Sequence, residues 1–411
     1  MKIFVIFTTT ELLIVFVIQT IGESMTNFTY SKITEAEAEL TWSIVEQALH
    51  RNADPNWNRK LGYENFRAIR SDGNILGGIA IIDMGQWFGG RKVRTGAVTS
   101  VGVAPEGRGI GAASTMLSNA LKEMKDNGMA ISTLFPSSVR VYRSKGYERS
   151  GVKLTYEAPI KEMRAALNKL KVEQASNDEE MVLLFNERAQ QGNGNLDRGS
   201  LLWDLITTSD GRPFYKYYIR DENQVVGYIN YQQSRSGDHI RIRDMVSSTQ
   251  QSSERILRFF ADHRTVIETI SWNGPPSDPL DFAMEEQETN LKSSTDWMVR
   301  VLNISDALEQ RGYPAGVNAS VDFEFNDNEI LENNGIWHLN INEGRGSVKK
   351  VTSPSSKQVL KLGPRGFAPL YTSHYSATDL KIMGIIDGSA ETIALANTIF
   401  AGPKPWIGEQ F

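Results

Sequence analysis

A glycine-rich turn at Arg108 to Ala113 has the residue types and spacing of a phosphate-binding turn. Arg108-Gly109-Ile110-Gly111-Ala112-Ala113 fits the pattern R/Q-x-x-G-x-G/A. A strand expected at Gly96 to Val103 precedes the turn, and a helix expected at Ala112 to Asn127 follows it. Such a turn exposes backbone N–H groups beside the positive end of the helix dipole, and small residues let a diphosphate approach closely. Because Arg108 adds a positive charge, we expect a diphosphate site here.

A second motif follows one strand later. The strand expected at Ala130 to Phe135 leads through Pro136-Ser137-Ser138 to a Tyr-x-x-x-Gly-Tyr segment that runs from Tyr142 to Tyr147. The glycine-rich turn and this tyrosine segment together are typical of the GNAT superfamily of N-acetyltransferases.

The chain from Met25 to Phe411 resembles one family within that superfamily, the Eis (enhanced intracellular survival) N-acetyltransferases. The resemblance is carried by Val98 to Val103 leading into Ala104-Pro105, by Ser137 to Tyr147, by Trp297 to Ile304 followed by Ala307 to Tyr313, and by the terminal phenylalanine. It implies two GNAT domains followed by a sterol-carrier-protein-like domain, a hexameric assembly, and acetylation of amines that include aminoglycosides.

The resemblance also places the contacts of acetyl-coenzyme A, the expected co-substrate. They fall on Val101, Gly102 and Val103, on Gly109, Ile110, Gly111, Ala112, Ala113 and Ser114, and on Ser137 and Ser138. We add Arg108 because of its charge. Backbone N–H groups at Val101 to Val103 are expected to polarise the acetyl carbonyl.

Tyr142 is the candidate general acid. A phenol has an unperturbed pKa of about 10, above that of a thiol, so it can protonate a departing thiolate. The alternative is that Tyr142 only packs against the sheet, as buried tyrosines usually do. The motif position favours the catalytic role, and we assign a structural role to Tyr147.

The candidate general base is the C-terminal carboxylate, which the resemblance assigns to Phe411. Most termini are poorly ordered, so a mobile tail is the alternative; against it, Trp406, Ile407 and Phe411 make this tail unusually apolar. A carboxylate with a pKa near ~3.5 is a weak base and needs a buried site or a relaying water. Gln410 replaces the family's acidic residue, with Glu409 one place earlier, which leaves the aminoglycoside range open.

The sequence predicts an α+β (mixed αβ) protein in three blocks, whose helices and strands position these residues. Residues 25–159 form the expected catalytic GNAT domain, with a helix marked by Leu40, Ile44, Val45 and Ala48 and a hairpin at Phe66 to Ile82. Residues 160–295 form a second, degenerate GNAT-like domain that repeats the hairpin. The matched positions are Ile69, Arg70, Gly77 and Ile79 with Ile219, Arg220, Gly227 and Ile229.

The second block lacks the phosphate turn. The strand expected at Ile240 to Val246 is followed by Ser247 to Glu254, which contains no glycine. We therefore expect one active site per chain, with the second block structural or lining the substrate cleft.

Residues 296–411 form the expected sterol-carrier-protein-like domain with its catalytic tail. The predicted strands are Trp297 to Ile304, Val321 to Phe325, Gly335 to Ile341, Gly346 to Val351 and Gln358 to Leu362, and the predicted helices are Phe367 to Tyr371 and Ala390 to Phe400. Because such a fold can hold a lipid, the rival hypothesis is a lipid- or acyl-binding regulatory module without turnover.

Composition narrows the partners. The 411 residues contain no cysteine, five scattered histidines and a net charge of −5, which excludes thiolate chemistry and argues against metal and nucleic-acid binding. We expect a cytoplasmic protein, without membrane attachment, that acts on a small-molecule or peptide amine.

Residues 1–24 are apolar but interrupted at Thr8 to Glu11, and they lack the cleavage pattern of a signal peptide. We interpret them as an upstream, non-native or mis-assigned extension, with a membrane anchor as the alternative.

Overall fold

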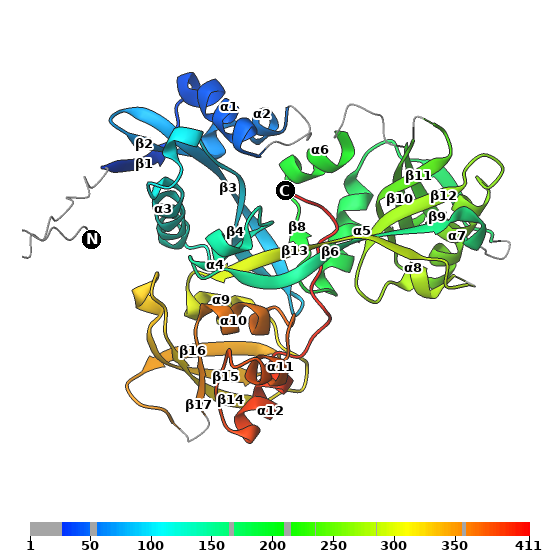
Figure 1. The fold of residues 1–411 in the computed structure, drawn as a ribbon. Helices are drawn as coiled ribbons and strands as arrows, with labels where there is room; N and C mark the ends of the chain where they lie inside the picture. Colours follow the sequence, from blue (N-terminus) through cyan, green and yellow to red (C-terminus); the bar gives the residue numbers. More distant parts are fainter. Residues whose placement is uncertain are drawn as a thin grey trace, which may run out of the picture.

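The computed structural model describes residues 27–49, 56–163, 168–208, 215–234, 236–284, 286–355 and 359–411. The expected extension at residues 1–24, His50 and the expected strand start at Gln358 lie outside these residues. Figure 1 shows three units: blue to cyan, green to yellow, and orange to red, with the red C-terminal tail running between the first two.

The elements of each unit follow the chain. The first unit holds β1 (Phe28–Lys32), α1 (Ala38–Leu49), α2 (Trp57–Leu61), β2 (Phe66–Ser71), β3 (Asn74–Phe88), β4 (Arg91–Val103), α3 (Ala112–Asp126), β5 (Ile131–Leu134), α4 (Val139–Arg143) and β6 (Glu148–Pro159). The second holds β7 (Lys171–Gln174), α5 (Glu179–Gln190), β8 (Leu196–Asp197), α6 (Ser200–Thr208), β9 (Tyr215–Asp221), β10 (Gln224–Gln233), β11 (His239–Ser247), α7 (Gln250–Ala261), β12 (Thr269–Gly274), α8 (Pro279–Phe282) and β13 (Asn290–Val301). The third holds α9 (Ile304–Gln310), β14 (Ala319–Phe325), β15 (Gly335–Asn342), β16 (Arg345–Val351), β17 (Val359–Leu362), α10 (Pro364–Tyr371), α11 (Ala377–Ile382) and α12 (Ala390–Ile399).

The first two units share one sheet of 13 strands, in the order β1-β2-β3-β4-β5-β13-β6-β12-β11-β10-β9-β7, with β8 paired to β3. The last strand of the second unit, β13, lies between β5 and β6 of the first. In turn, β6 pairs with β12 of the second unit. The two units are therefore joined by exchanged strands, and the expected mixed αβ architecture is confirmed.

The predicted repeat of the hairpin is present in the backbone. An isoleucine lies opposite a glycine beside a register shift in both hairpins: Ile69 opposite Gly77, and Ile219 opposite Gly227. The first central residue of each turn is also alike, because φ is 50° at Asp72 and 51° at Glu222, whereas the next residue has positive φ only at Gly73 of the first hairpin. Two hairpins that share register and bulge support duplication over chance similarity.

The third unit is built on a separate sheet of four strands, in the order β16-β15-β14-β17. Val321, Phe323 and Phe325 of β14 face its core, as their alternation predicts. The strand predicted at Trp297 to Ile304 is corrected: β13 ends at Val301, and Ile304 already begins α9. Asn303 starts that helix, because its Oδ1 accepts from the N–H of Asp306 at 3.2 Å.

The predicted boundary at residue 296 falls inside β13, a strand of the large sheet. The alternating apolar residues of β13 do not reveal which sheet the strand joins, because partner choice is not a local property. The three predicted domain ranges stay a prediction.

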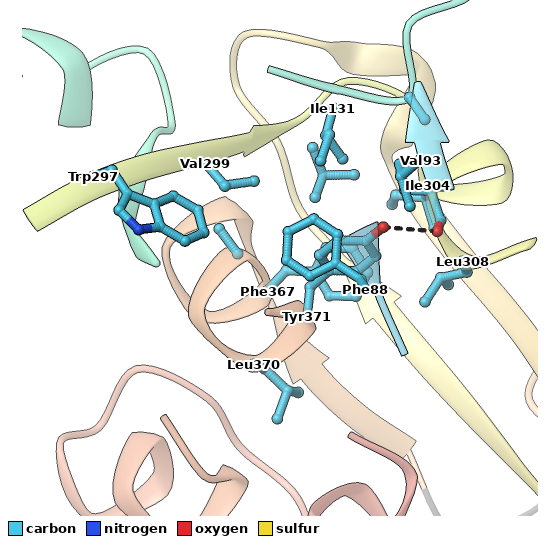
Figure 2. Close-up of a cluster of buried hydrophobic side chains, with 14 of the residues drawn as sticks. Phe88, Val93, Ile131, Trp297, Val299, Ile304, Leu308, Phe367, Leu370 and Tyr371 are labelled. Carbon is cyan, nitrogen blue, oxygen red and sulfur yellow. Dashed lines mark hydrogen bonds between the residues drawn. The ribbon is translucent and has the colours of Figure 1, made fainter. Parts of the chain in front are cut away.

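A core of aromatic residues joins the third unit to the first (Figure 2). Phe88 of β3 packs against Tyr371 of α10 with ring centroids 5.4 Å apart. The Tyr371 hydroxyl donates to the carbonyl of Ala307 at 3.0 Å, the bond drawn as a dashed line. Burying an aromatic or aliphatic side chain of this size contributes about 1.5–3 kcal/mol, so this cluster holds the two units together.

A buried ion pair joins β13, the last strand of the second unit, to the third unit next to the tyrosine motif. Arg300 of β13 donates to Asp327 at 2.6 Å, and both side chains are at most 1% exposed. Lys145 reaches Glu329 of the same loop at 3.1 Å. These contacts fasten the segment after α4 to the third unit.

Among the described residues, no helix combines the length and the apolar character needed to cross a membrane.

Strand β4 has a bulge just before the glycine-rich turn. Gly78 pairs with Gly102 and Ala80 pairs with Thr99. Between these two pairs β3 has one residue, whereas β4 has two, Ser100 and Val101. A bulge disrupts the regular ladder and bends the strand, so backbone groups there can serve another partner.

Ser100 has a φ of 49°, in the left-handed region that non-glycine residues avoid. Its hydroxyl stabilises this conformation by donating to Asn58 at 2.7 Å and accepting from the Trp57 indole at 3.2 Å. The bulge is thus held by α2, which packs beside it.

Two substitutions at Ser100 separate backbone strain from the loss of these hydrogen bonds. Ser100→Ala and Ser100→Gly both remove the hydroxyl, but only alanine keeps a Cβ at positive φ. We expect the free energy of unfolding to be about 1 kcal/mol lower for Ser100→Ala than for Ser100→Gly, measured by urea denaturation. Equal stability of the two variants, or a more stable alanine variant, would contradict a left-handed Ser100.

Candidate active site

The glycine-rich turn leaves the first turn of α3 open to a ligand. Gly109 and Gly111 have φ values of 79° and 94°, which only glycine adopts readily. The first helical bond runs from Thr115 N–H to Gly111 C=O at 3.0 Å, and Gly111 offers no side-chain cap. The N–H groups before Thr115 therefore have no partner within the helix, the arrangement that binds phosphate groups.

The predicted coenzyme A residues form one continuous strip from β4 to α3 and the loop after β5. Exposed members are Arg108, Gly109, Ile110, Gly111, Ser114, Ser137 and Ser138; Val101, Val103 and Ala113 are half-buried; Gly102 and Ala112 are buried. The Arg108 Nε donates to the carbonyl of Val103 at 3.3 Å, which holds the guanidinium beside the turn.

Gly102 has a packing role in addition to its predicted contact with acetyl-CoA. A Cβ there would come within 2.7 Å of the Cα of Val45 in α1. Any contact of Gly102 with a ligand is therefore made by its backbone, while its lack of a side chain serves the helix behind it.

The two tyrosines of the second motif have different surroundings. Tyr142 lies in α4, is 4% exposed, and lines a pocket. Tyr147 is fully buried and its hydroxyl lies 2.7 Å from that of Ser132, which donates to the Gly96 carbonyl at 2.8 Å. Burial raises the pKa of Tyr147 well above its ordinary value. This geometry supports a structural role for Tyr147, which stays a prediction.

The C-terminal residue lies in the same pocket as Tyr142. The pocket is lined by Leu49, Val98, Thr99, Ser100, Val101, Phe135, Ser137, Tyr142 and Phe411. The Phe411 ring packs on Phe135 with centroids 5.4 Å apart, and Phe411 is only 2% exposed. About 20 Å³ remains in the pocket, enough for roughly one water molecule.

The structure thus brings Val101, Ser137, Tyr142 and Phe411 together, four of the residues predicted from sequence. The remaining predicted residues form the adjoining turn and helix start. Sequence reasoning missed Ser100 and Phe135, because neither a serine in a strand nor a phenylalanine at a strand end carries a distinguishing local signal.

The equivalent helix start in the second unit is closed. Thr249 caps α7, since its side chain accepts from the Ser252 N–H at 3.1 Å and the Ser252 hydroxyl contacts the Thr249 N–H at the same distance. A helix start whose N–H groups are satisfied by its own side chains has less to offer a phosphate. This supports the prediction of a single coenzyme A site per chain.

The described residues hold no group of three or more His, Asp or Glu side chains arranged for a metal ion. His239, for example, contacts Thr269 at 2.7 Å and Ser271 at 2.8 Å.

Comparison with known proteins identifies all three units. Residues 29–150 and residues 194–301 each match an acetyltransferase (GNAT) domain family, and residues 304–408 match a sterol carrier protein domain family. A search of curated proteins finds no significant match.

Several solved structures match nearly the whole chain. A GCN5-related N-acetyltransferase from Anabaena variabilis is 32% identical over 94% of this chain and 100% of its own, with a TM-score of 0.88. One from Kribbella flavida is 25% identical over 94% and 98%, with a TM-score of 0.83. Eis1 from Mycobacterium abscessus is 20% identical over 94% and 100%, with a TM-score of 0.77, so its likeness is one of fold.

The expected Eis-like architecture of two GNAT domains and a sterol-carrier-protein-like domain is confirmed. The Anabaena variabilis protein is 32% identical over its full length, and the first GNAT domain of this chain has an open helix start. The chain therefore belongs to the GCN5-related N-acetyltransferase family.

Proposed function

We propose that this enzyme transfers the acetyl group of acetyl-CoA to a primary amine, with Tyr142 as general acid and the Phe411 carboxylate as general base. The observation that carries the proposal is that both residues line the same pocket, at the bulge of β4.

The strip from β4 to α3 supports binding of acetyl-CoA. The open N–H groups at the start of α3 suit the diphosphate, and the charge of Arg108 lies beside them. The bulge at Ser100 and Val101 frees backbone groups near the pocket for the acetyl carbonyl. Stabilising the oxygen as it gains negative charge is usually the largest single contribution to acyl transfer.

The two proton transfers fall to the two groups that line the pocket. The nitrogen of the amine attacks the acetyl carbon, and the bond to sulfur breaks; the Tyr142 hydroxyl then gives its proton to the thiolate. The Phe411 carboxylate accepts the proton that the amine loses, directly or through one water.

The substrates that we propose are small-molecule or peptide amines. Aminoglycosides, polyamines and protein lysines all satisfy the chemistry, and Gln410 in place of an acidic residue separates this chain from the pattern expected for aminoglycosides. The hexamer implied by the Eis resemblance and the expected cytoplasmic location are part of the same proposal.

The rival role as a lipid-binding module has less support. Phe323 and Phe325 both pack on Phe367 inside the third unit, with ring centroids 6.0 and 5.5 Å from it. These rings fill part of the interior that an acyl chain would need.

A thiol-release assay tests the function. Wild-type protein with acetyl-CoA should release coenzyme A in the presence of at least one member of a panel of aminoglycosides, polyamines and lysine peptides, because each offers a nucleophilic amine. Absence of amine-dependent release across the panel, with lipid extracted from the purified protein, would favour the binding module instead.

Tyr142→Phe tests the general acid. Removing the hydroxyl while keeping the ring should lower kcat by about a hundredfold or more, since acid catalysis contributes on the order of 10²–10⁴-fold. Acetyl-CoA affinity, measured by calorimetry, should stay near the wild-type value. Tyr375→Phe, at an exposed tyrosine of the third unit, is the matched control. A parallel loss of affinity and kcat would indicate that Tyr142 only packs.

Extension of the chain beyond Phe411 tests the general base. Two added residues, Gly-Ser, move the carboxylate and convert the Phe411 carbonyl into a neutral amide, so turnover should be lost while the melting temperature is retained. The same Gly-Ser inserted in the exposed turn between β15 and β16 serves as the control. An extended enzyme with wild-type kcat would refute the carboxylate base.

A further inference from the structure

Besides its backbone pairing with Val152 of β6, the end of the chain is held by the second unit, although Phe411 lies in the pocket of the first. Trp406 donates its N–H to the carbonyl of Asn193 at 3.0 Å. Asn273 of β12 donates to the carbonyl of Gly408 at 2.6 Å. Both partners belong to the second unit, and Gly408 is three positions before the terminal carboxylate.

Beyond Gly408, the side chains of Arg198 and Glu409 form a second attachment, which we call the clamp. Arg198 donates to both carboxylate oxygens of Glu409, at 2.7 and 2.9 Å. The Arg198 side chain is 2% exposed and that of Glu409 is 9% exposed. Such a bidentate contact fixes direction as well as distance.

The clamp is itself held from behind. Arg198 also donates to Asp244 of β11, and the Tyr228 hydroxyl donates to the same Asp244 oxygen at 2.7 Å. The guanidinium lies over the Phe185 ring, 3.5 Å from its centroid. Burial alone would lower the pKa of Arg198, but the Asp244 and Glu409 carboxylates raise it above its ordinary value. Arg198 is therefore a charged group with one orientation.

We propose that Arg198 is a positioning residue for acetyl transfer: through Glu409 it sets where the Phe411 carboxylate lies in the pocket beside Tyr142. This inference rests on the proposed role of that carboxylate. Two residues of chain span at most about 7 Å, so a displaced Glu409 displaces the carboxylate as well. A misplacement of about 1 Å at a reacting group can cost on the order of 10²-fold in rate.

On this proposal, the second GNAT domain has a role in catalysis: it positions the tail. Arg198, Asp244, Tyr228 and Asn273 all come from the unit whose helix α7 is closed to phosphate. That unit holds the base of a reaction whose coenzyme site lies in the other.

Glu409→Ala is the first test, because it releases the tail and leaves Arg198 paired with Asp244. Substituting Arg198 by an apolar residue would instead leave a buried, unpaired charge on Asp244, which is strongly destabilising and could unfold the unit. We expect Glu409→Ala to lower kcat by about tenfold to a hundredfold, with little change in acetyl-CoA affinity or melting temperature. Glu180→Ala, which removes a carboxylate from Arg220 at 2.9 Å in the same unit, is the matched control.

Arg198→Lys is the conservative variant. A lysine keeps the charge beside Asp244 but cannot make the two-pronged contact, so kcat should fall between the wild-type value and that of Glu409→Ala. A merely structural role would instead make kcat follow the folded fraction in every variant.

The outcomes separate this proposal from the proposed function. If the wild type releases thiol and Glu409→Ala matches Glu180→Ala in kcat, the positioning role is wrong while acetyl transfer stands. If kcat falls only as far as the folded fraction does, the positioning role is also wrong. If the wild type releases no thiol with any amine, both proposals are overturned.

Discussion

Every buried backbone N–H and C=O group of β5 needs a partner, and β13 provides it on one side of that strand. Leaving such a group unpaired costs about 1–3 kcal/mol. Residues Met298 to Val301 pair with β5 along one edge of β13, while Asn290 to Val299 pair with β6 along the other. Because β13 belongs to the second unit by sequence, this one requirement fuses two domains into one sheet. It also carries Arg300 to its contact with Asp327 of the third unit.

The fused sheet carries two GNAT domains whose corresponding helices start differently. Gly111 starts α3 without a side-chain cap, whereas Thr249 starts α7 with a reciprocal capping arrangement. The hairpins on which both helices depend keep the same register. Divergence therefore changed what the helix start can bind while leaving the scaffold intact, which is the usual relation between a fold and the sites it carries.

The candidate site is assembled from parts that are distant in the chain. The bulge of β4 and the start of α3 come from one local segment, and Tyr142 follows one strand later. Phe411 arrives from the far end, along a path set by Val152, Asn273 and Arg198. In the proposed mechanism, a base supplied by the chain terminus depends on every contact along that path, so the second and third units would contribute to the chemistry.

The sequence by itself determined the local features: the hairpins, the glycine-rich turn, the helix that follows it, and the absence of that turn in the second unit. These were predictable because backbone conformation at Gly109 and Gly111, capping, and apolar periodicity act over a few neighbouring residues. The shared family pattern added Tyr142, the terminal carboxylate and the three-part architecture. Only the tertiary structure decided that β13 enters the first sheet, that Ser100 forms a bulge, and that Arg198 holds Glu409. The last two residues lie 211 positions apart, and no local signal reports a pairing at that separation, because it exists only once independent elements have packed together.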